Sequence, residues 1–232
     1  MKHAIYLKGE FEAEGLEQTE VAALITTSKV YGLKLAIKIG GCEARSDYMF
    51  CRKIMADAVI APMIESPFAA EKLVELKSVW SPDRLCINIE TDTGVKNIES
   101  ILDVIEAPGI GIVFGRSDYS ASIGLKGEVN HDQVFKAVHI VAEACLARNI
   151  SLTVGGGMHY SGFLQLKSDS TICQAMDFVE TRKVVFDARA ELSEDDFIQA
   201  IELECQILSS RQEILTYEAE SLATRIGSIR TR

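Results

Sequence analysis

Two short segments of the chain each place a carboxylate at the end of an apolar run: Ile87-Asn88-Ile89-Glu90-Thr91 and Val113-Phe114-Gly115-Arg116-Ser117-Asp118. An apolar run of this length is typical of a buried strand, so each acid is expected at the C-terminal end of its strand. Parallel α/β folds bind their ligands at that end. We therefore expect Glu90 and Asp118 to hold a divalent cation together, and Mg²⁺ is the natural ion for a set of oxygen ligands.

Acids at the ends of other expected strands are further candidates for chemistry: Glu10, Glu43, Glu65 and Glu180. Several buried acids at one rim need cations or protons beside them, because an unpaired buried charge is costly. The four histidines show no spacing typical of a zinc site. Only His159 follows an expected strand closely enough for its loop to reach the rim.

Other roles for these residues stay open. Asp118 could cap a turn, and Glu90 could pair with Lys38 or Arg116. Glu43 either contacts a substrate or caps the next helix. Arg182 could meet an anionic substrate, or form a salt bridge with Glu180 or Asp187.

Strands and helices alternate along most of the chain. Apolar runs predict strands at 4–11, 34–39, 58–63, 84–90, 110–114, 150–154 and 177–186. Segments of helical composition lie between them at 18–31, 45–55, 96–105 and 131–149, and Ser66-Pro67 is typical of a helix start. Repeated β–α units imply a parallel sheet with right-handed crossovers. Seven strands, or eight if the last run is split, favour a (β/α)8 TIM-type barrel over an open sheet.

The last part of the chain predicts one long helix or a helix pair. We expect residues 1–192 to form the barrel and residues 193–232 a helical extension. Two rows recur every seven residues: Ile201, Leu208, Leu215 and Leu222, and Ile198, Cys205, Ala219 and Ile226, the second interrupted by Gln212. This seam packs on the chain's own barrel, on a neighbouring subunit, or on both, and a homo-oligomer through this helix is expected.

Composition and charge limit the kinds of partner that the chain is expected to bind. The chain has 232 residues, 47% of them hydrophobic, and a formal net charge of −10. Nucleic acid and anionic membranes both need clustered Lys and Arg, so neither is expected as a partner. The start of the chain does not look like a signal peptide, and no apolar run is long enough to cross a bilayer. Six scattered cysteines without a CxxC pair indicate buried, reduced thiols and a cytoplasmic protein.

At its strand ends the chain resembles the HpcH/HpaI aldolase and citrate lyase family, within the phosphoenolpyruvate/pyruvate barrel superfamily. The resemblance spans residues 8–187 and is carried by Ala61-Pro62-Met63-Ile64-Glu65, Ile89-Glu90-Thr91, and Gly115-Arg116-Ser117-Asp118 followed by Ser120 and Gly124. It implies that Glu90 and Asp118 bind Mg²⁺ or Mn²⁺. It also implies that the backbone of Gly115, Arg116 and Ser117 receives the carboxylate of a 2-oxo acid, and that Lys38 supports the oxyanion.

Three features depart from the family's pattern. Lys38 stands where the aldolases usually carry Arg, so it supplies the charge without the bidentate fork. Phe11 stands where they carry a catalytic His, and phenylalanine cannot transfer protons. General acid–base work must then fall to another group or be absent; the candidates are Glu10, Glu12, Glu43, His159 and a metal-bound water. The chain also starts at the family's second strand, which implies a shortened or rearranged barrel.

The resemblance therefore implies a carbon–carbon lyase of the class II, metal-dependent aldolase type. It would make or break a C–C bond of a small 2-oxo acid, such as pyruvate or oxaloacetate, through a metal-stabilised enolate. Lys38, Glu10 and Glu43 are the expected catalytic groups. Two alternatives remain: a citrate-lyase-like enzyme acting on an acyl-CoA, and a non-catalytic barrel that binds a metabolite.

Overall fold

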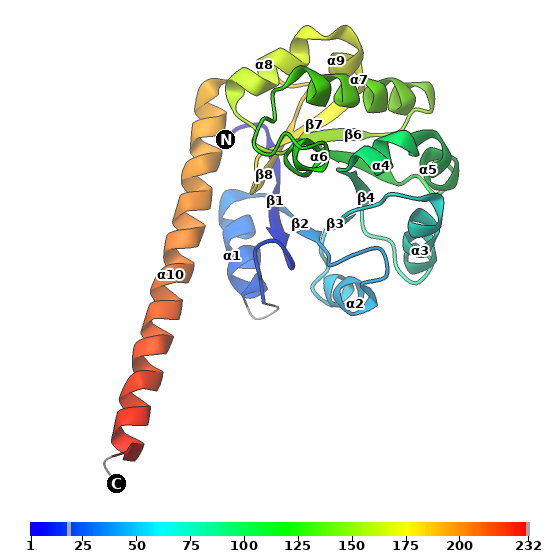
Figure 1. Cartoon of the computed structure of the whole chain (residues 1–232). Helices are drawn as coiled ribbons and strands as arrows, with labels where there is room; N and C mark the ends of the chain where they lie inside the picture. Colours follow the sequence, from blue (N-terminus) through cyan, green and yellow to red (C-terminus); the bar gives the residue numbers. More distant parts are fainter. Residues whose placement is uncertain (18–19, 231–232) are drawn as a thin grey trace.

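A closed barrel of eight strands forms the centre of the computed structural model, which describes residues 1–17 and 20–230. The strands follow one another around the barrel in chain order, and helices surround them (Figure 1). The strands are β1 (Ala4–Glu10), β2 (Lys34–Lys38), β3 (Ala58–Ala61), β4 (Arg84–Ile89), β5 (Gly111–Gly115), β6 (Leu152–Gly155), β7 (Met176–Glu180) and β8 (Val184–Asp187). The predicted TIM-type barrel is therefore confirmed.

The helices follow the strands in β–α order. They are α1 (Val21–Tyr31), α2 (Arg45–Lys53), α3 (Pro67–Lys77), α4 (Asp92–Lys96), α5 (Ile98–Ile105), α6 (Arg116–Ser122), α7 (Asp132–Ala147), α8 (Tyr160–Ser168), α9 (Ser170–Ala175) and α10 (Glu194–Arg230). Ser66 caps α3 by accepting a hydrogen bond from the Ala69 amide, and Pro67 opens that helix as predicted. The first two residues of the predicted helix 18–31 lie outside the described residues.

The last strand corrects the expectation of an all-parallel sheet. The apolar run 177–186 splits into β7 and β8, joined by a hairpin in which the Thr181 amide donates to the Val184 carbonyl at 2.9 Å. Because a hairpin reverses the chain, β8 runs antiparallel to both β7 and β1. The barrel thus closes with one reversed strand between β7 and β1.

Side chains alternate between the inside of the barrel and its helix-covered outside. In β1, Tyr6 belongs to a small inner cluster with Ala36 and Ala58, whereas Leu7 packs in the large core beneath the helices. Lys8 and Glu10 share the inner face with Tyr6, because side chains two residues apart in a strand point the same way. The inner face of the barrel is therefore apolar toward the N-terminal ends of its strands and charged toward their C-terminal ends.

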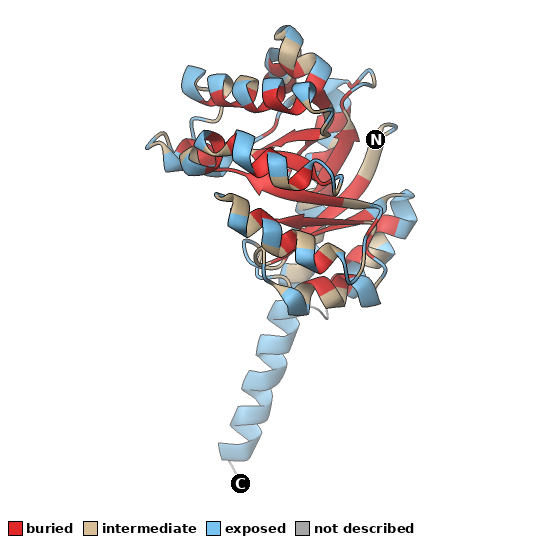
Figure 2. Ribbon diagram, turned by 90° about the vertical axis from the view of Figure 1, so that its right-hand side faces the viewer, coloured by how far each residue is buried: buried red, intermediate tan, exposed pale blue. Residues whose placement is uncertain are grey.

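Helix α10 has two different halves (Figure 1). Near its start, Phe197 is 2% exposed and its ring lies 5.5 Å from that of Phe186 in β8. Ile207 still packs against the core and Arg211 still donates to the carbonyls of Glu14 and Gly15, whereas every described residue after Arg211 is exposed (Figure 2). No helix among residues 1–17 and 20–230 combines the length and the apolar character needed to cross a membrane.

Candidate active site

Glu90 is the most buried carboxylate at the C-terminal ends of the strands, the region that we call the mouth. Its side chain follows β4 and is 1% exposed. Oε1 accepts a hydrogen bond from the Met63 amide at 3.0 Å, and Oε2 accepts one from Asn88 Nδ2 at 2.8 Å. Lys38 Nζ lies 3.4 Å from Oε2. Of the two alternative partners of Glu90, the structure shows Lys38 and not Arg116.

The pKa of Glu90 is raised, mainly because burial disfavours its charged form. Lys38, Asn88 and the Met63 amide oppose this shift, and the charge of Asp118 adds to it. The two acids predicted as a pair therefore interact electrostatically across the ends of two adjacent strands. A carboxylate in this position is held in its charged form only when positive charge lies close to it.

Asp118 differs from Glu90 in its surroundings. It lies in the first turn of α6 and is exposed. Among the described residues its side chain forms no hydrogen bond or ion pair. Gly115 lies against Glu90: a Cβ atom at this position would come within 2.7 Å of Glu90 Oε2. Only glycine leaves room for the Glu90 carboxylate here.

A second buried network joins β1 to β7. Lys8 Nζ lies 2.7 Å from Glu180 Oε1 and 3.1 Å from Glu10 Oε1, and all three side chains are less than 10% exposed. Burial alone would lower the pKa of Lys8, but Glu180 and Glu10 raise it above its usual value. Burial would likewise raise the pKa of Glu10, but Lys8 and Lys38 lower it. Glu10 is therefore ionised near neutral pH.

Lys38 connects the two networks. It is paired in register with Glu10 on β1 and lies 3.4 Å from Glu90. Phe11, which follows Glu10, turns its ring to Phe50 of α2, with centroids 6.0 Å apart. The position of the family's histidine is thus filled by an apolar contact with a helix.

The segment Gly115–Ser117 leads from β5 into α6 at the mouth. Arg116 and Ser117 are the first two residues of α6, so their backbone N–H groups have no acceptor within the helix. A Cβ atom on Gly156, which has φ +84°, would come within 2.5 Å of the Ser117 nitrogen. Gly156 therefore lies against these two amides, and any larger residue at this position would collide with them.

The Arg116 side chain does not face the mouth. Its guanidinium is 2% exposed and donates to the carbonyls of Gly155 and Gly156 and to Asn130 Oδ1, at 2.8–3.1 Å. Burial lowers its pKa to about 10, so it remains charged near neutral pH. Arg116 therefore fixes the glycine loop after β6, and only its backbone is available to a ligand.

The structure keeps four other candidates out of the buried networks. Glu43 has a side chain that is 71% exposed, with Lys72 at 3.9 Å, and the N-cap of α2 is Ala44 rather than Glu43. Glu65 is exposed and accepts a hydrogen bond from Thr91. His159 is exposed at the start of α8. Arg182 pairs with Glu14 at 3.4 Å, not with Glu180 or Asp187.

Sequence reasoning missed Lys8 and Asn88. Lys8 is a buried cation, and Asn88 is 4% exposed with an Oδ1 atom that accepts no hydrogen bond from the described residues. The alternation of strand side chains carries the missing signal, because Lys8 lies two residues before Glu10 and Asn88 two before Glu90. Polar residues at that spacing share the inner face with the acids.

Fold and site together define a class: an eight-stranded β/α barrel with buried acids and the start of a helix at the C-terminal ends of its strands. A family model described as HpcH/HpaI aldolase/citrate lyase matches residues 43–165, more than half of the chain. The chain belongs to this family, and the resemblance seen in the sequence is confirmed. The family is one of aldolases and lyases, which supports lyase chemistry in general. Glu90, Gly115 and Asp118 lie inside the matched stretch, whereas Glu10 and Lys38 precede it.

Solved structures of the same family share the fold. An HpcH/HpaI aldolase/citrate lyase family protein from Burkholderia cenocepacia J2315 superposes with a TM-score of 0.64 at 18% identity, over 89% of this chain and 85% of its own. An HpcH/HpaI aldolase from Desulfitobacterium hafniense DCB-2 gives 0.61 at 16% identity, over 76% of each chain. The citrate synthase SbnG gives 0.60 at 17% identity, over 90% and 83%. No curated protein sequence matches the chain.

Proposed function

We propose that the chain is a carbon–carbon lyase that acts on a small 2-oxo acid with a divalent cation, Mg²⁺ or Mn²⁺, held by Glu90 and Asp118. The observation that carries the proposal is the pair itself. The buried carboxylate of Glu90 interacts electrostatically with that of Asp118, which has no hydrogen bond or ion pair among the described residues, beside the first turn of α6. Such a pair suits Mg²⁺, which takes one or two carboxylates and fills its remaining positions with waters and substrate oxygens.

The charges at the mouth support a divalent cation. Five carboxylates, those of Glu10, Glu14, Glu90, Asp118 and Glu180, lie with four cations, those of Lys8, Lys38, Arg182 and Lys183, which leaves a formal charge of −1. Among the described residues no three His, Cys, Asp or Glu side chains gather as a metal-binding group, so the protein would supply two ligands at most. A cation here would also offset the burial and, to a smaller extent, the charge of Asp118, which together raise the pKa of Glu90.

The chain's own residues would bind and orient the substrate. The Arg116 and Ser117 amides would donate hydrogen bonds to the substrate carboxylate, and Lys38 would supply positive charge to the oxyanion that develops on the keto oxygen. Met63 and Asn88 would hold the Glu90 carboxylate in place. When bound, the cation would supply Lewis-acid polarisation of the 2-oxo acid.

Proton transfer needs a group other than Phe11. Glu10 is the buried carboxylate next to it in sequence and is in the ionised form that a general base needs, although its lowered pKa makes it a weaker base than an ordinary glutamate. Glu43 is exposed and 3.9 Å from Lys72, so it would act only if its loop moved toward the substrate. We therefore favour Glu10 over Glu43 as the base.

Proton NMR of pyruvate in D₂O tests the proposal directly. With Mg²⁺, the protein should exchange the methyl protons for deuterium, and EDTA should stop the exchange. Glu90→Gln and Asp118→Asn should each reduce the rate at least about 100-fold, because each removes a ligand charge needed only for the reaction. Exchange that persists in EDTA, or in either variant, would contradict the proposed site.

Glu65→Gln is the matched control. Glu65 is also an acid that follows a strand, but it is exposed and bonded to Thr91. This variant should exchange pyruvate protons at the rate of the unsubstituted protein. Equal losses in all three variants would indicate a general effect of removing acidic charge rather than a metal pair.

A second candidate is condensation or cleavage of an acyl-CoA thioester. It is favoured by the fold that the chain shares with a citrate synthase over 90% of its length. Assays with acetyl-CoA and oxaloacetate distinguish the two, since only the second candidate would consume acetyl-CoA, either to a longer acyl-CoA or, if water also hydrolyses the thioester, to the free acid and the CoA thiol. Glu90 and Asp118 would be needed in both.

A further inference from the structure

The distal segment of α10, Glu204–Arg230, carries apolar side chains that the barrel does not cover. Along one side of the helix run Leu208, Leu215, Ala219, Leu222, Ile226 and Ile229, which we call the distal seam. Leu208, Leu215 and Leu222 are 50%, 51% and 60% exposed. The helix is 37 residues long, about 55 Å at 1.5 Å per residue. Most of the distal segment stands free of the barrel (Figure 2).

The seam is not the face that docks on the barrel. The barrel contacts are made by Phe197, Ala200 and Leu203, which are buried. Ile201, one seven-residue step before Leu208, is already 38% exposed although it lies beside those contacts. The seven-residue repeat therefore does not serve to pack the helix on the chain's own barrel, and packing on another molecule remains.

The distal segment also lacks stabilisation of its own. Among the described residues, no ion pair joins two side chains of α10, and the one ion pair that the segment makes, from Arg211, goes to Glu20 beside α1. An isolated helix in water gains little without packing of its apolar face. The segment therefore needs a partner for its seam.

We propose that the partner is a second copy of this chain, and that the two distal segments pair as an antiparallel coiled coil. If Ala219 lies opposite Leu222 of the second copy, the same register places Leu215 opposite its Ile226 and Gln212 opposite its Ile229. Apolar rows then meet along the whole overlap, with one glutamine at each end. Seven-residue repeats of this kind specify helix pairing.

Charges beside the seam decide the direction. Glu218 and Arg225 are seven residues apart and so flank the seam on the same edge. In the antiparallel pair, Glu218 of each copy faces Arg225 of the other, which gives two symmetric ion pairs. In a parallel pair, Arg225 of one copy would instead face Arg230 of the other, and like charges would repel.

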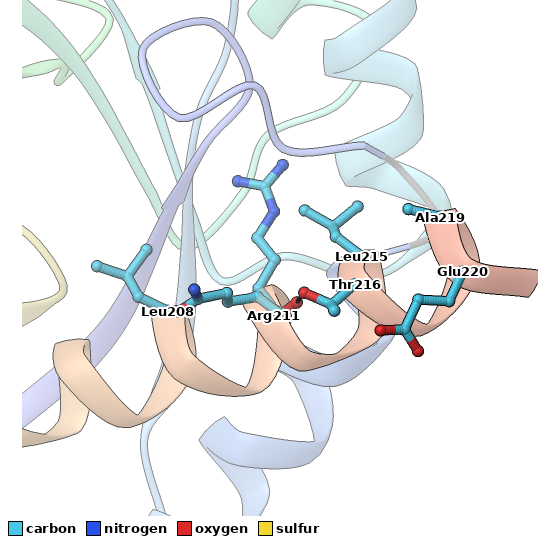
Figure 3. A pocket seen from close by; sticks show the side chains of 7 residues that line it. Leu208, Arg211, Leu215, Thr216, Ala219 and Glu220 are labelled. Atoms are coloured by element: carbon cyan, nitrogen blue, oxygen red, sulfur yellow. Dashed lines mark hydrogen bonds between the residues drawn. The ribbon is translucent and has the colours of Figure 1, made fainter. Parts of the chain in front are cut away.

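A groove beside α1 receives the end of the second helix. It has a volume of about 490 Å³ and lies between α1, with Leu24 and Tyr31, and α10, with Leu208 and Leu215. Figure 3 shows Arg211, Leu215 and Ala219 projecting from the same side of α10. In the antiparallel register, Ile226 and Ile229 of the second copy reach the level of this groove.

The mass of the protein in solution tests the pairing. Light scattering should give twice the 25.5 kDa of one chain. Leu215→Ser combined with Leu222→Ser should return it to one chain, without loss of the pyruvate exchange or of the barrel's near-ultraviolet signal. Tyr217→Ser is the matched control, because Tyr217 is 74% exposed on the opposite side of the helix, and it should leave the doubled mass unchanged. A single-chain mass for the unsubstituted protein, with or without binding to lipid vesicles, would overturn the proposal.

Charge reversal tests the direction. Glu218→Arg alone and Arg225→Glu alone should each weaken the dimer, and the double variant should restore it. The two residues are too far apart on one helix to pair with each other, so rescue requires contact between copies. A double variant that is weaker than both single variants would contradict the antiparallel register.

Cysteine crosslinking tests the relative direction of the two helices independently. Cys205 is free and exposed on the seam side. A parallel pair would place the two Cys205 side chains together and crosslink them on oxidation, whereas the antiparallel pair keeps them apart. In a Cys205→Ser background, a mixture of Gln212→Cys and Ile229→Cys chains should form a mixed disulfide. Crosslinking through Cys205 instead would overturn the antiparallel arrangement.

Discussion

The mouth of the barrel and the distal segment of α10 break opposite rules of protein structure. The mouth buries charged side chains, with Glu90 1% exposed and Lys8 6% exposed. The distal segment leaves large apolar side chains in water, with Leu222 60% exposed and Ile229 56%. Buried charges are costly unless paired, and contiguous exposed apolar groups mark interaction surfaces. Each region therefore points to a partner, an ionic one at the mouth and an apolar one on the helix.

The two regions also differ in what holds them. The buried charged side chains at the mouth are held by contacts between strands of the closed barrel: Lys8 on β1 pairs with Glu180 on β7, and Lys38 on β2 pairs with Glu90 after β4. Helix α10 is attached to the barrel only near its N-terminal end, through Phe197 and, within the distal segment, through Arg211. Substitutions at the mouth should therefore affect the stability of the whole barrel, whereas those on the distal segment should affect only association.

The largest effect is expected from breaking the buried pair of Lys8 and Glu180. Glu180→Ala should lower the free energy of unfolding by about 3 kcal/mol, because it leaves a buried ammonium with one of its two partners. Glu213→Ala on the exposed distal segment is the matched control and should change stability by less than about 0.5 kcal/mol. Urea unfolding of both variants at one chain concentration checks this. An equal loss of unfolding free energy in the two variants would contradict the difference proposed between the mouth and the distal segment.

The distal segment should melt separately from the barrel. Far-ultraviolet circular dichroism should show a first transition, due to this helix, at a temperature that rises with chain concentration. The reason is mass action, since a dimer is favoured by about 1.4 kcal/mol for each tenfold increase in concentration. In Leu215→Ser with Leu222→Ser, the first transition should lose its concentration dependence. A single transition at all concentrations would indicate that the helix and the barrel unfold together.

Much of the mouth could be predicted because its acids follow apolar runs. Glu90 and Asp118 end such runs, and the order of β–α units fixes that they lie on adjacent strands. The reversed β8 could not be predicted, since Thr181-Arg182-Lys183 contains none of the Gly or Asn residues that usually announce a hairpin. Glu180 and Val184 therefore read as one strand.

Lys8 and the exposed helix show two further limits. A lysine in an apolar strand reads as a surface residue, and only its partner Glu180, 172 residues further on, explains its burial. Cys205 was expected to be a buried thiol and is exposed. Cys205 belongs to the same seven-residue repeat as Leu208. Such a repeat predicts that the helix packs on an apolar surface, but not whether that surface belongs to the same chain or to another.

A smaller, pH-dependent effect is expected at Glu10. Its pKa is lowered in the folded protein, where Lys8 and Lys38 overcome the effect of burial. The stability that it contributes is therefore present above the usual Glu pKa, about 4.3, and is lost as the pH falls through the lowered value. Glu10→Gln should be less stable than the unsubstituted protein near neutral pH, and the difference should shrink in acid. Urea midpoints across this range check the direction, and a deficit independent of pH would contradict it.

The smallest effect is expected at Met63, whose amide donates to Glu90 from a left-handed backbone with φ 55°. Met63→Gly relieves about 1–2 kcal/mol of backbone strain in the folded protein. It also stabilises the unfolded state by about 0.4–1 kcal/mol, because glycine has more conformational entropy there. The net change in stability should therefore stay within about 1 kcal/mol, and the same holds for Met55→Gly at the exposed end of α2, where φ is also 55°. Pyruvate exchange should survive in both variants, because the amide that holds Glu90 is retained. Loss of exchange in Met63→Gly alone would show that the thioether side chain, which is 50% exposed at the mouth, contacts the substrate itself.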